Sequence, residues 1–211
     1  MPSSAGATLP VQQRAWETRE RILTAAVQCL AEEGYAATTT SRIQARSGVS
    51  RGSLLHQFPS RDDLLIAAVQ HLGVQRATDY DAAQAGGSPA DADRAVDALW
   101  ATFTGPLFSA ALQLWTAAQH NPDLAASLVP HERELGRRIR VSAAAMFGER
   151  NAAHPRFSEL LSLLVSSMRG VALTYTFDPR DAATDPHLAA WRRLAHDILD
   201  DVATESAASS D

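Results

Sequence analysis

The stretch that decides the fold lies between residues 38 and 61 and reads TTTSRIQARSGVSRGSLLHQFPSR. Its opening threonines predict a helix over about residues 40–47, because a threonine side chain can accept a hydrogen bond from a free backbone N–H at a helix start. Gly48 allows the left-handed backbone of a tight turn. Ser50 is placed to cap a second helix over residues 51–58, which ends before Pro59. Two short helices joined by a glycine turn are typical of a helix-turn-helix.

The apolar residues of this stretch give the two helices a reason to pack. Ile43 on the first helix, Val49 in the turn and Leu54 on the second helix must meet to hold the pair at a fixed angle. The second helix would then present a polar face to the major groove of DNA, where its side chains can bond phosphates and base edges. We expect DNA contacts from Thr39, Thr40, Arg42, Ser50, Arg51, Gly52, Ser53, His56, Gln57 and Arg61. The alternative for Arg51 is a solvated surface arginine.

The charge of the chain is divided unevenly. Up to Arg61 the sequence has seven arginines and four glutamates, a net charge of +3, although the whole chain of 211 residues carries −5. A basic N-terminal segment and an acidic remainder favour a small nucleic-acid-binding module attached to a larger domain with another function. Every basic residue other than histidine is arginine, since the sequence has no lysine.

Apolar residues at helical spacing continue on both sides of the motif. Further helices are predicted over residues 16–33, 61–78, 90–104, 106–119, 122–147, 155–177 and 186–204. Four of these begin at a proline, whose missing N–H costs nothing at a helix start. No segment alternates long enough for a strand, so we expect an all-α fold of about nine helices. It would comprise a flexible arm (1–13), a three-helix DNA-binding domain (14–60) and an all-helical ligand-binding and dimerisation domain (61–211).

With these features in place, the sequence resembles the TetR family of regulators. The resemblance covers Arg19 to about Leu65 and rests on one run of residues. They are Arg21-Ile22-Leu23, Ala25-Ala26, Gly34-Tyr35, Thr38-Thr39, Ile43, Gly48-Val49-Ser50-Arg51-Gly52-Ser53-Leu54, His56, Phe58, Ser60-Arg61 and Leu64-Leu65. The resemblance implies a homodimeric transcription repressor with a ligand pocket in its C-terminal domain. Such a protein releases palindromic operator DNA when a small-molecule effector binds.

The sequence departs from the family pattern at three positions. Leu55 stands where the family usually has a tyrosine that contacts a phosphate. Gln57 replaces a frequent histidine, and Gln44 replaces a small alanine that lets the two helices pack closely. These departures indicate altered phosphate contacts and altered helix packing, so the family's operator sequences do not transfer to this chain.

Aromatic residues in the C-terminal part could line an apolar pocket. Phe103, Phe108, Leu112 and Trp115 lie on the central helices where the resembled family keeps its pocket, and ligand pockets are largely apolar with a few polar anchors. His120 and Arg137 are the expected polar anchors. At helical spacing, such aromatic residues are also typical of an ordinary core.

Two apolar stripes near the C-terminus predict the dimer interface. They comprise Phe157, Leu161, Leu164 and Met168 on one helix, and Trp191, Leu194 and Ile198 on the next. Two such helices from each subunit would build a four-helix bundle with twofold symmetry. This symmetry would set the two recognition helices about one DNA turn apart. The alternative is that the stripes pack on their own subunit.

The sequence offers little for other classes of protein. No apolar run approaches the ~20 residues that span a bilayer, and the first residues do not resemble a secretory signal. We therefore expect a cytoplasmic protein with no membrane partner. The seven histidines show no zinc-binding spacing, and no phosphate loop or nucleophile elbow is present, so we expect no enzyme, metal or cofactor.

Three other interpretations stay open. Cys29, the single cysteine, is expected in the core, where a thiol is inert, rather than as a redox switch. The chain could be a ligand-binding or adaptor protein that keeps the helix-turn-helix only as a scaffold. It could also be a helical enzyme, although no catalytic constellation supports that interpretation.

Overall fold

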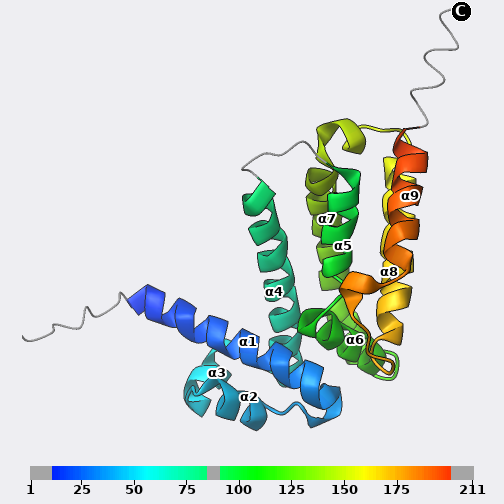
Figure 1. Ribbon diagram of the computed structural model, residues 1–211. Coiled ribbons are helices and arrows are strands. Elements are labelled where there is room, and N and C mark those ends of the chain that lie inside the picture. The colour runs from blue at the N-terminus through cyan, green and yellow to red at the C-terminus, as the bar shows by residue number, and fades with distance from the viewer. Residues whose placement is uncertain (1–10, 85–90, 201–211) are drawn as a thin grey trace, which may run out of the picture. The chain divides into compact units, whose positions relative to one another are not determined.

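The computed structural model describes residues 11–84 and 91–200 of the chain. Within these ranges it contains nine α-helices, one short 3-10 helix and no strand (Figure 1). The helices are α1 (Val11–Ala37), α2 (Thr40–Ser47), α3 (Arg51–Gln57), α4 (Arg61–Gln84), α5 (Ala92–Ala101), α6 (Pro106–Ala118), α7 (Pro122–Ala152), α8 (Phe157–Thr174) and α9 (His187–Leu199), with the 3-10 helix at Ala182–Thr184. The predicted all-α fold is confirmed.

The chain divides into two compact units. The first comprises the residues up to Leu72 together with Ala110–Val129, and the second comprises Gly73–Ser109 and the residues from Pro130 onwards. Helices α4, α6 and α7 contribute residues to both units. The predicted domain boundary after residue 60 therefore does not coincide with the division into units. The predicted N-terminal arm falls mostly on residues 1–10, which lie outside the described residues, and α1 already begins at Val11.

Glycine and proline mark the ends of the helices, as their backbone chemistry requires. Helical geometry in α1 is broken at Gly34, where φ is +79°, so the regular helix ends where the sequence predicts. Gly148, with a φ of +77°, breaks α7 in the same way, directly after the predicted last residue Phe147. Helices α6 and α7 begin at Pro106 and Pro122.

The first unit builds a small apolar core around α1. Ile22, Leu23, Cys29 and Leu30 are fully buried on α1, and Ile43 is fully buried on α2. Burial raises the pKa of the Cys29 thiol, which favours its neutral form. This environment is that of an inert core thiol, as the sequence predicts.

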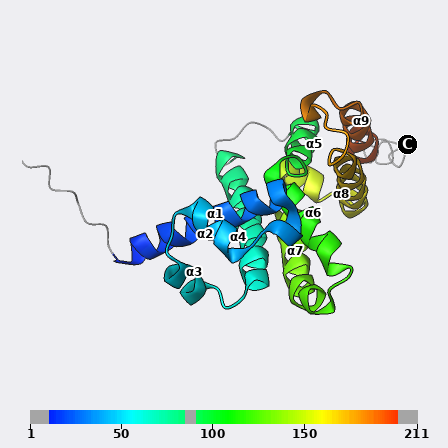
Figure 2. The ribbon, with the colours of Figure 1, turned by 90° about the horizontal axis from the view of Figure 1, so that it is seen from below.

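In the second unit, α9 packs between α5 and α8, and both views show these helices side by side (Figures 1 and 2). Trp100 on α5 is the centre of the contact. Its ring lies 5.0 Å from that of Trp191 on α9 and 5.7 Å from that of Tyr175, which follows α8. The Trp100 indole N–H donates to the Ala182 carbonyl at 2.8 Å, so the buried donor is satisfied.

One helix has the length and composition to cross a membrane. Among the described residues, α8 meets that test alone, and α5 with α6 meets it as a pair bent by 57°. At 18 residues, α8 comes closer to a spanning length than the sequence analysis expects. Only 33% of its residues are buried within the chain.

Candidate nucleic-acid interface

Side-chain caps and one left-handed glycine build the unit of α2, turn and α3. Thr39 caps α2 by accepting a hydrogen bond from the Arg42 N–H at 3.2 Å. The chain leaves α2 through Gly48, whose φ of +65° suits glycine. Ser50 then caps α3 by accepting from the Ser53 N–H at 3.2 Å. The helix-turn-helix predicted from the sequence is present, with the capping residues in the expected places.

The three apolar residues expected to hold the motif together are buried. Ile43 is fully buried, Leu54 is 2% exposed and Val49 is 9% exposed. Leu54 is the buried residue of α3. The opposite side of this short helix therefore faces away from the core of the unit.

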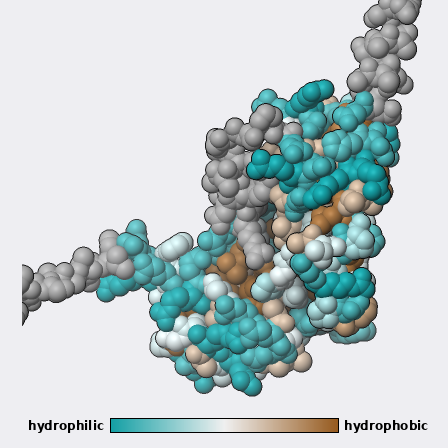
Figure 3. Space-filling model, viewed as in Figure 1, coloured by the Kyte–Doolittle hydropathy of each residue, from teal (hydrophilic) through white to brown (hydrophobic). Residues whose placement is uncertain are grey.

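The outer face of α3 carries a different set of side chains from the one the sequence suggests. Arg51, Gly52, Leu55 and His56 are exposed, whereas Ser53 and Gln57 are half-buried. On the neighbouring elements, Thr39, Arg42 and Ser50 are exposed and Thr40 is half-buried. In the view of Figure 3, the surface over α2 and α3 is mainly hydrophilic. The predicted contact residues thus share one region, but the sequence analysis did not place Leu55 within it.

Two arginines tie α1 to α2. The Arg21 guanidinium donates to the Ser47 carbonyl at 2.5 Å, near the C-terminal end of α2, where carbonyls lack helical partners. Arg46 pairs with Glu32 at 2.5 Å. Both contacts join residues far apart in sequence, and no local pattern signals them. Arg21 fixes the orientation of the motif and was missed as a functional residue, although it belongs to the run on which the family resemblance rests.

Arg42 is exposed but has a nearby carboxylate. Its Nε lies 3.5 Å from Glu33 Oε2 on α1, and 67% of its side chain is exposed. Such an exposed pair contributes little to stability. Arg42 can therefore leave Glu33 for a phosphate at small cost, and it remains a predicted DNA contact.

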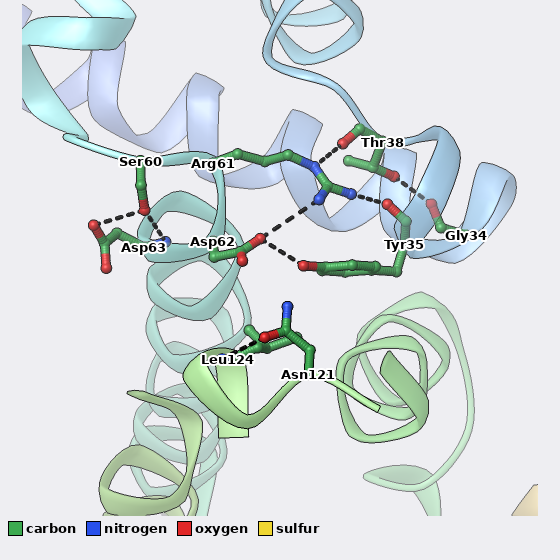
Figure 4. Close-up of polar contacts among 9 residues, drawn as sticks. All are labelled: Gly34, Tyr35, Thr38, Ser60, Arg61, Asp62, Asp63, Asn121 and Leu124. Carbon is green, nitrogen blue, oxygen red and sulfur yellow. Dashed lines mark hydrogen bonds and ion pairs between the residues drawn. The ribbon is translucent and has the colours of Figure 1, made fainter. Parts of the chain in front are cut away.

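Arg61 takes a different role from the one predicted. Its Nε donates to the Thr38 carbonyl at 2.5 Å and its Nη2 donates to the Tyr35 carbonyl (Figure 4). The guanidinium also lies over the Tyr35 ring, 4.1 Å from its centroid, and its Nη1 lies 3.5 Å from Asp62 Oδ1. These contacts occupy Arg61 within the protein, so we correct its assignment from a phosphate contact to a residue that positions α1 and α4.

Tyr35 and Asp62 complete this arrangement. The Tyr35 hydroxyl donates to Asp62 Oδ1 at 2.8 Å, and the pKa of Tyr35 is raised by burial and by this hydrogen bond (Figure 4). Ser60 caps α4, since its Oγ accepts from the Asp63 N–H at 3.0 Å. The end of α1 and the start of α4 are thus held together by neutral and charged hydrogen bonds around Arg61.

The residues predicted to line a ligand pocket are divided between the units. Phe103 and Phe108 belong to the second unit, where both are buried and their rings lie 5.7 Å apart edge to face. Arg137 also belongs to it, and pairs with Glu134 on the same helix. Leu112, Trp115 and His120 belong to the first unit, where His120 is exposed and the other two are half-buried. The ligand pocket therefore stays a prediction.

All but one of the residues predicted for the dimer interface lie in the core of the second unit. Leu194 is half-buried. Phe157, Leu161, Leu164, Met168, Trp191 and Ile198 are all buried within the single chain. These two stripes hold α8 and α9 onto their own subunit, which is the alternative that the sequence left open. We therefore correct the interface residues, because a side chain already covered by its own subunit offers no open face to a partner.

A polar cluster that the sequence analysis missed anchors α9. Asp185 is buried and accepts a hydrogen bond from the Tyr175 hydroxyl and, at 2.7 Å, from the His187 N–H. Its Oδ1 also lies 2.8 Å from the His187 ring Nδ1. Burial alone would raise the pKa of Asp185, but these hydrogen bonds outweigh it and hold the pKa below its ordinary value. Tyr175 is affected in the opposite direction, since burial and Asp185 raise its pKa to about 12.

No group of three or more histidine, cysteine, aspartate or glutamate side chains placed to hold a metal ion occurs in the described ranges. The polar side chains on α2 and α3 are hydroxyl, guanidinium, amide and imidazole groups. Their chemistry suits phosphate oxygens and base edges rather than a cation.

Comparison with known proteins connects this geometry to a family. Residues 22–68 match the tetR family of bacterial regulatory proteins. The chain is 30% identical over 166 residues to the HTH-type transcriptional regulator CymR of Pseudomonas putida, covering 76% of this chain and 80% of that protein.

Solved structures share the fold. GusR of Salmonella enterica superposes with a TM-score of 0.64 at 23% identity, covering 92% of this chain and 98% of that one. A transcriptional regulator from Saccharomonospora viridis, solved in complex with choline, superposes with a TM-score of 0.59 at 22% identity, covering 88% and 96%. Because the match to CymR spans most of both chains and the helix-turn-helix lies within the family's own segment, this chain belongs to the tetR family of bacterial transcriptional regulators.

Proposed function

We propose that this chain is a homodimeric repressor that acts on operator DNA in the cytoplasm. Each subunit would place α3 in the major groove of one half of a palindrome. A small organic effector would bind the second unit and release the DNA. Membership of the tetR family supports the regulatory role, and the arrangement of side chains on α2 and α3 supports the mode of contact.

Arg51 carries the proposal. It is exposed at the first position of α3, and no hydrogen bond or ion pair holds its side chain within the described part of the chain. Arg42, Arg46 and Arg61 all have protein partners. Arg51 thus keeps all of its N–H donors for a phosphate or for the O6 and N7 atoms of a guanine, the base edge that a guanidinium contacts most often.

The neighbouring polar groups extend this contact. His56 lies on the same exposed face as Arg51, and Ser53 and Gln57 flank it. Thr39, Thr40 and Ser50 stand near the starts of α2 and α3, where hydroxyls and free backbone N–H groups can bond phosphates. Together with Arg42 and the backbone of Gly52, they form the proposed DNA contact set.

The proposed dimer contact uses the open side of α8 instead of the buried stripes. Leu163 and Leu173 are each 47% exposed, and Ser162, Ser166 and Gly170 are exposed between them. Small residues among leucines allow two helices to approach closely. Pairing with a second copy of α8 would remove these two exposed leucines from water.

Effector binding would act by population shift. A ligand that binds better to the subunit state unsuited to DNA lowers DNA affinity by the same coupling free energy. Helices α4, α6 and α7 contribute residues to both units, so they are the covalent routes for this coupling. The regulator from Saccharomonospora viridis binds choline, which supports a small organic molecule as the class of effector.

The experiment that tests the proposal measures the binding of duplex DNA by the full chain. A duplex is first selected from a random pool, and its dissociation constant is then followed against salt concentration. We expect Arg51→Ala to raise the dissociation constant at least tenfold and to lower the salt slope by about one, because one phosphate or base contact is lost.

Arg94→Ala is the matched control. Arg94 is an exposed arginine on α5, so its removal changes the net charge equally without touching α2 or α3. Equal losses in the two variants would mean that binding responds to overall charge alone. Failure to select any duplex at low salt would favour the ligand-binding or adaptor alternative.

The dimer contact is tested by molar mass in solution. Leu163→Glu, which places a charge on the open side of α8, is expected to yield a monomer with weakened DNA binding. Val141→Glu changes an apolar residue of α7 that is 70% exposed and is expected to leave the dimer intact. A dimer that survives Leu163→Glu would exclude this face as the contact.

A further inference from the structure

An apolar side chain lies on the face of α3 that we propose for DNA. Leu55 is 47% exposed, and it is the one large exposed apolar residue on the helix pair α2 and α3. Leu54, the preceding residue, already fills the core position of this helix. Leu55 is therefore not a buried core residue of this helix, and the core does not account for a leucine at this place.

The register of α3 puts Leu55 near the middle of the exposed face. With about 3.6 residues per turn, Arg51 and Leu55 lie on nearly the same side of the helix, and Gly52 and His56 lie further round it. The four residues form one continuous exposed arc, since all of them are exposed. Arg51 and His56 stand at its edges, and Leu55 and Gly52 stand between them.

Gly52 leaves room beside Leu55. A Cβ built on Gly52 would meet no atom within 4 Å, so the space next to the helix is open there. The middle of the arc thus consists of uncovered backbone at Gly52 and one branched apolar side chain, that of Leu55. If this face lay in the major groove, base edges on the groove floor would contact the isobutyl group of Leu55. Arg51 and His56, at the edges of the arc, could then donate to polar atoms of the DNA.

We propose that Leu55 reads the 5-methyl group of a thymine in the major groove. This inference rests on the proposed function, because it concerns the same contact with duplex DNA. Thymine is the one base that presents a methyl group in that groove, and apolar side chains contact it. A leucine can neither donate nor accept a hydrogen bond. A polar base edge packed against it would therefore lose its hydrogen bonds to water and gain none in return.

The position also separates this chain from the family pattern noted above. A tyrosine there would bond a phosphate, which carries no sequence information. Leu55 has no hydroxyl and exchanges that contact for one to a base. The operator of this chain is therefore expected to contain a required thymine in each half-site, opposite α3.

The test removes only the methyl group. Each thymine of the selected duplex is replaced in turn by deoxyuridine, symmetrically in both half-sites, and the dissociation constants of the native chain and of Leu55→Ala are compared. At one thymine we expect deoxyuridine to weaken binding by the native chain about fourfold per half-site, as loss of one buried methyl group predicts. The same replacement should leave binding by Leu55→Ala unchanged.

His56→Ala is the control on the same face, and it should keep the full sensitivity to deoxyuridine. Because Leu55 lies outside the core, Leu55→Ala should unfold at the same temperature as the native chain. The inference is overturned if the native chain is insensitive to deoxyuridine at every thymine, or if Leu55→Ala keeps the sensitivity. If no duplex is bound at all, the proposed function itself fails first, and this result is distinct from binding that ignores the methyl group.

Discussion

The two units of this chain differ in the range of the interactions that define them. In the first unit, short-range features determine where α2 and α3 begin and end. Thr39 and Ser50 each accept a hydrogen bond from the backbone N–H three residues later, and Gly48 forms the turn between the two helices. In the second unit, defining contacts join residues far apart, as where Trp100 donates to the carbonyl of Ala182, 82 residues later. Short-range features can be seen in a sequence, whereas long-range partners cannot.

The first unit also depends on long-range contacts, of which those of Arg61 are the most extensive, so the difference between the units is one of degree. Arg61 joins the end of α1 to the start of α4 through the Tyr35 and Thr38 carbonyls. If local signals sufficed, removing Arg61 would matter little. Substitutions at such distant contacts measure how much the stability of each unit relies on them.

The largest effect is expected for Arg61→Ala. The change leaves the Tyr35 and Thr38 carbonyls without their charged donor and removes the contact with the Tyr35 ring, so the free energy of unfolding should fall by about 3 kcal/mol. Chemical denaturation of the full chain measures this loss. Arg61→Lys should recover only part of it, because one ammonium group cannot match the planar fork of the guanidinium. A loss below about 0.5 kcal/mol, the size of an ordinary surface substitution, would refute the positioning role.

A smaller loss is expected for Asp185→Asn in the second unit. The neutral amide keeps the shape but weakens the bonds from Tyr175 and His187, which should cost about 2 kcal/mol. Because the folded pKa of Asp185 lies below its ordinary value, this carboxylate contributes stability above about pH 4 that is lost as the pH falls through the folded pKa. As the pH is lowered from 6 to 2, the unfolding temperature should therefore fall less steeply for Asp185→Asn than for the native chain. Parallel curves would contradict this role.

The smallest effect is expected at His196, which links α9 to α5. Its Nε2 lies 3.1 Å from Asp93 Oδ1 and its Nδ1 lies 3.3 Å from Asp200 Oδ2. Burial alone would lower the pKa of His196, but these two carboxylates raise it above its ordinary value.

The stabilisation from His196 is therefore complete below about pH 6.5 and is lost as the pH rises through the folded pKa. Since half of the side chain is exposed, solvent screening should keep the effect below about 1 kcal/mol. His196→Gln should remove the decline in unfolding temperature between pH 6 and pH 8.5. If the decline in unfolding temperature persists in His196→Gln, the titration of another group causes it.

The sequence predicted the fold class and the helix-turn-helix because their signals are local. The positive φ values at Gly34 and Gly48 and the caps at Thr39 and Ser50 follow from residue type and spacing. Helices α6 and α7 begin at prolines for the same reason. The division into units was not predictable, because it depends on how distant segments pack, as with Ala110–Val129 joining the N-terminal helices.

The errors in the candidate sites have the same physical origin. Arg61 looks like any basic residue near a DNA-binding motif until its two carbonyl partners are known. The stripes with Leu164 and Trp191 have the spacing of an interface, but helical periodicity gives only a common face and not what covers it. Leu55 was recognised as a departure from the family, yet its exposure becomes apparent only once Leu54 is seen to fill the core.

Burial of the single cysteine gives this protein a practical advantage for spectroscopy. Cys29 is fully buried and its thiol is held in the neutral form, so it should react slowly with maleimides and methanethiosulfonates. A cysteine introduced on α3 would then be the sole accessible attachment point for a fluorophore or spin label. In the proposed dimer, the separation of the two labels could be followed as a candidate effector is titrated, without first removing a native thiol.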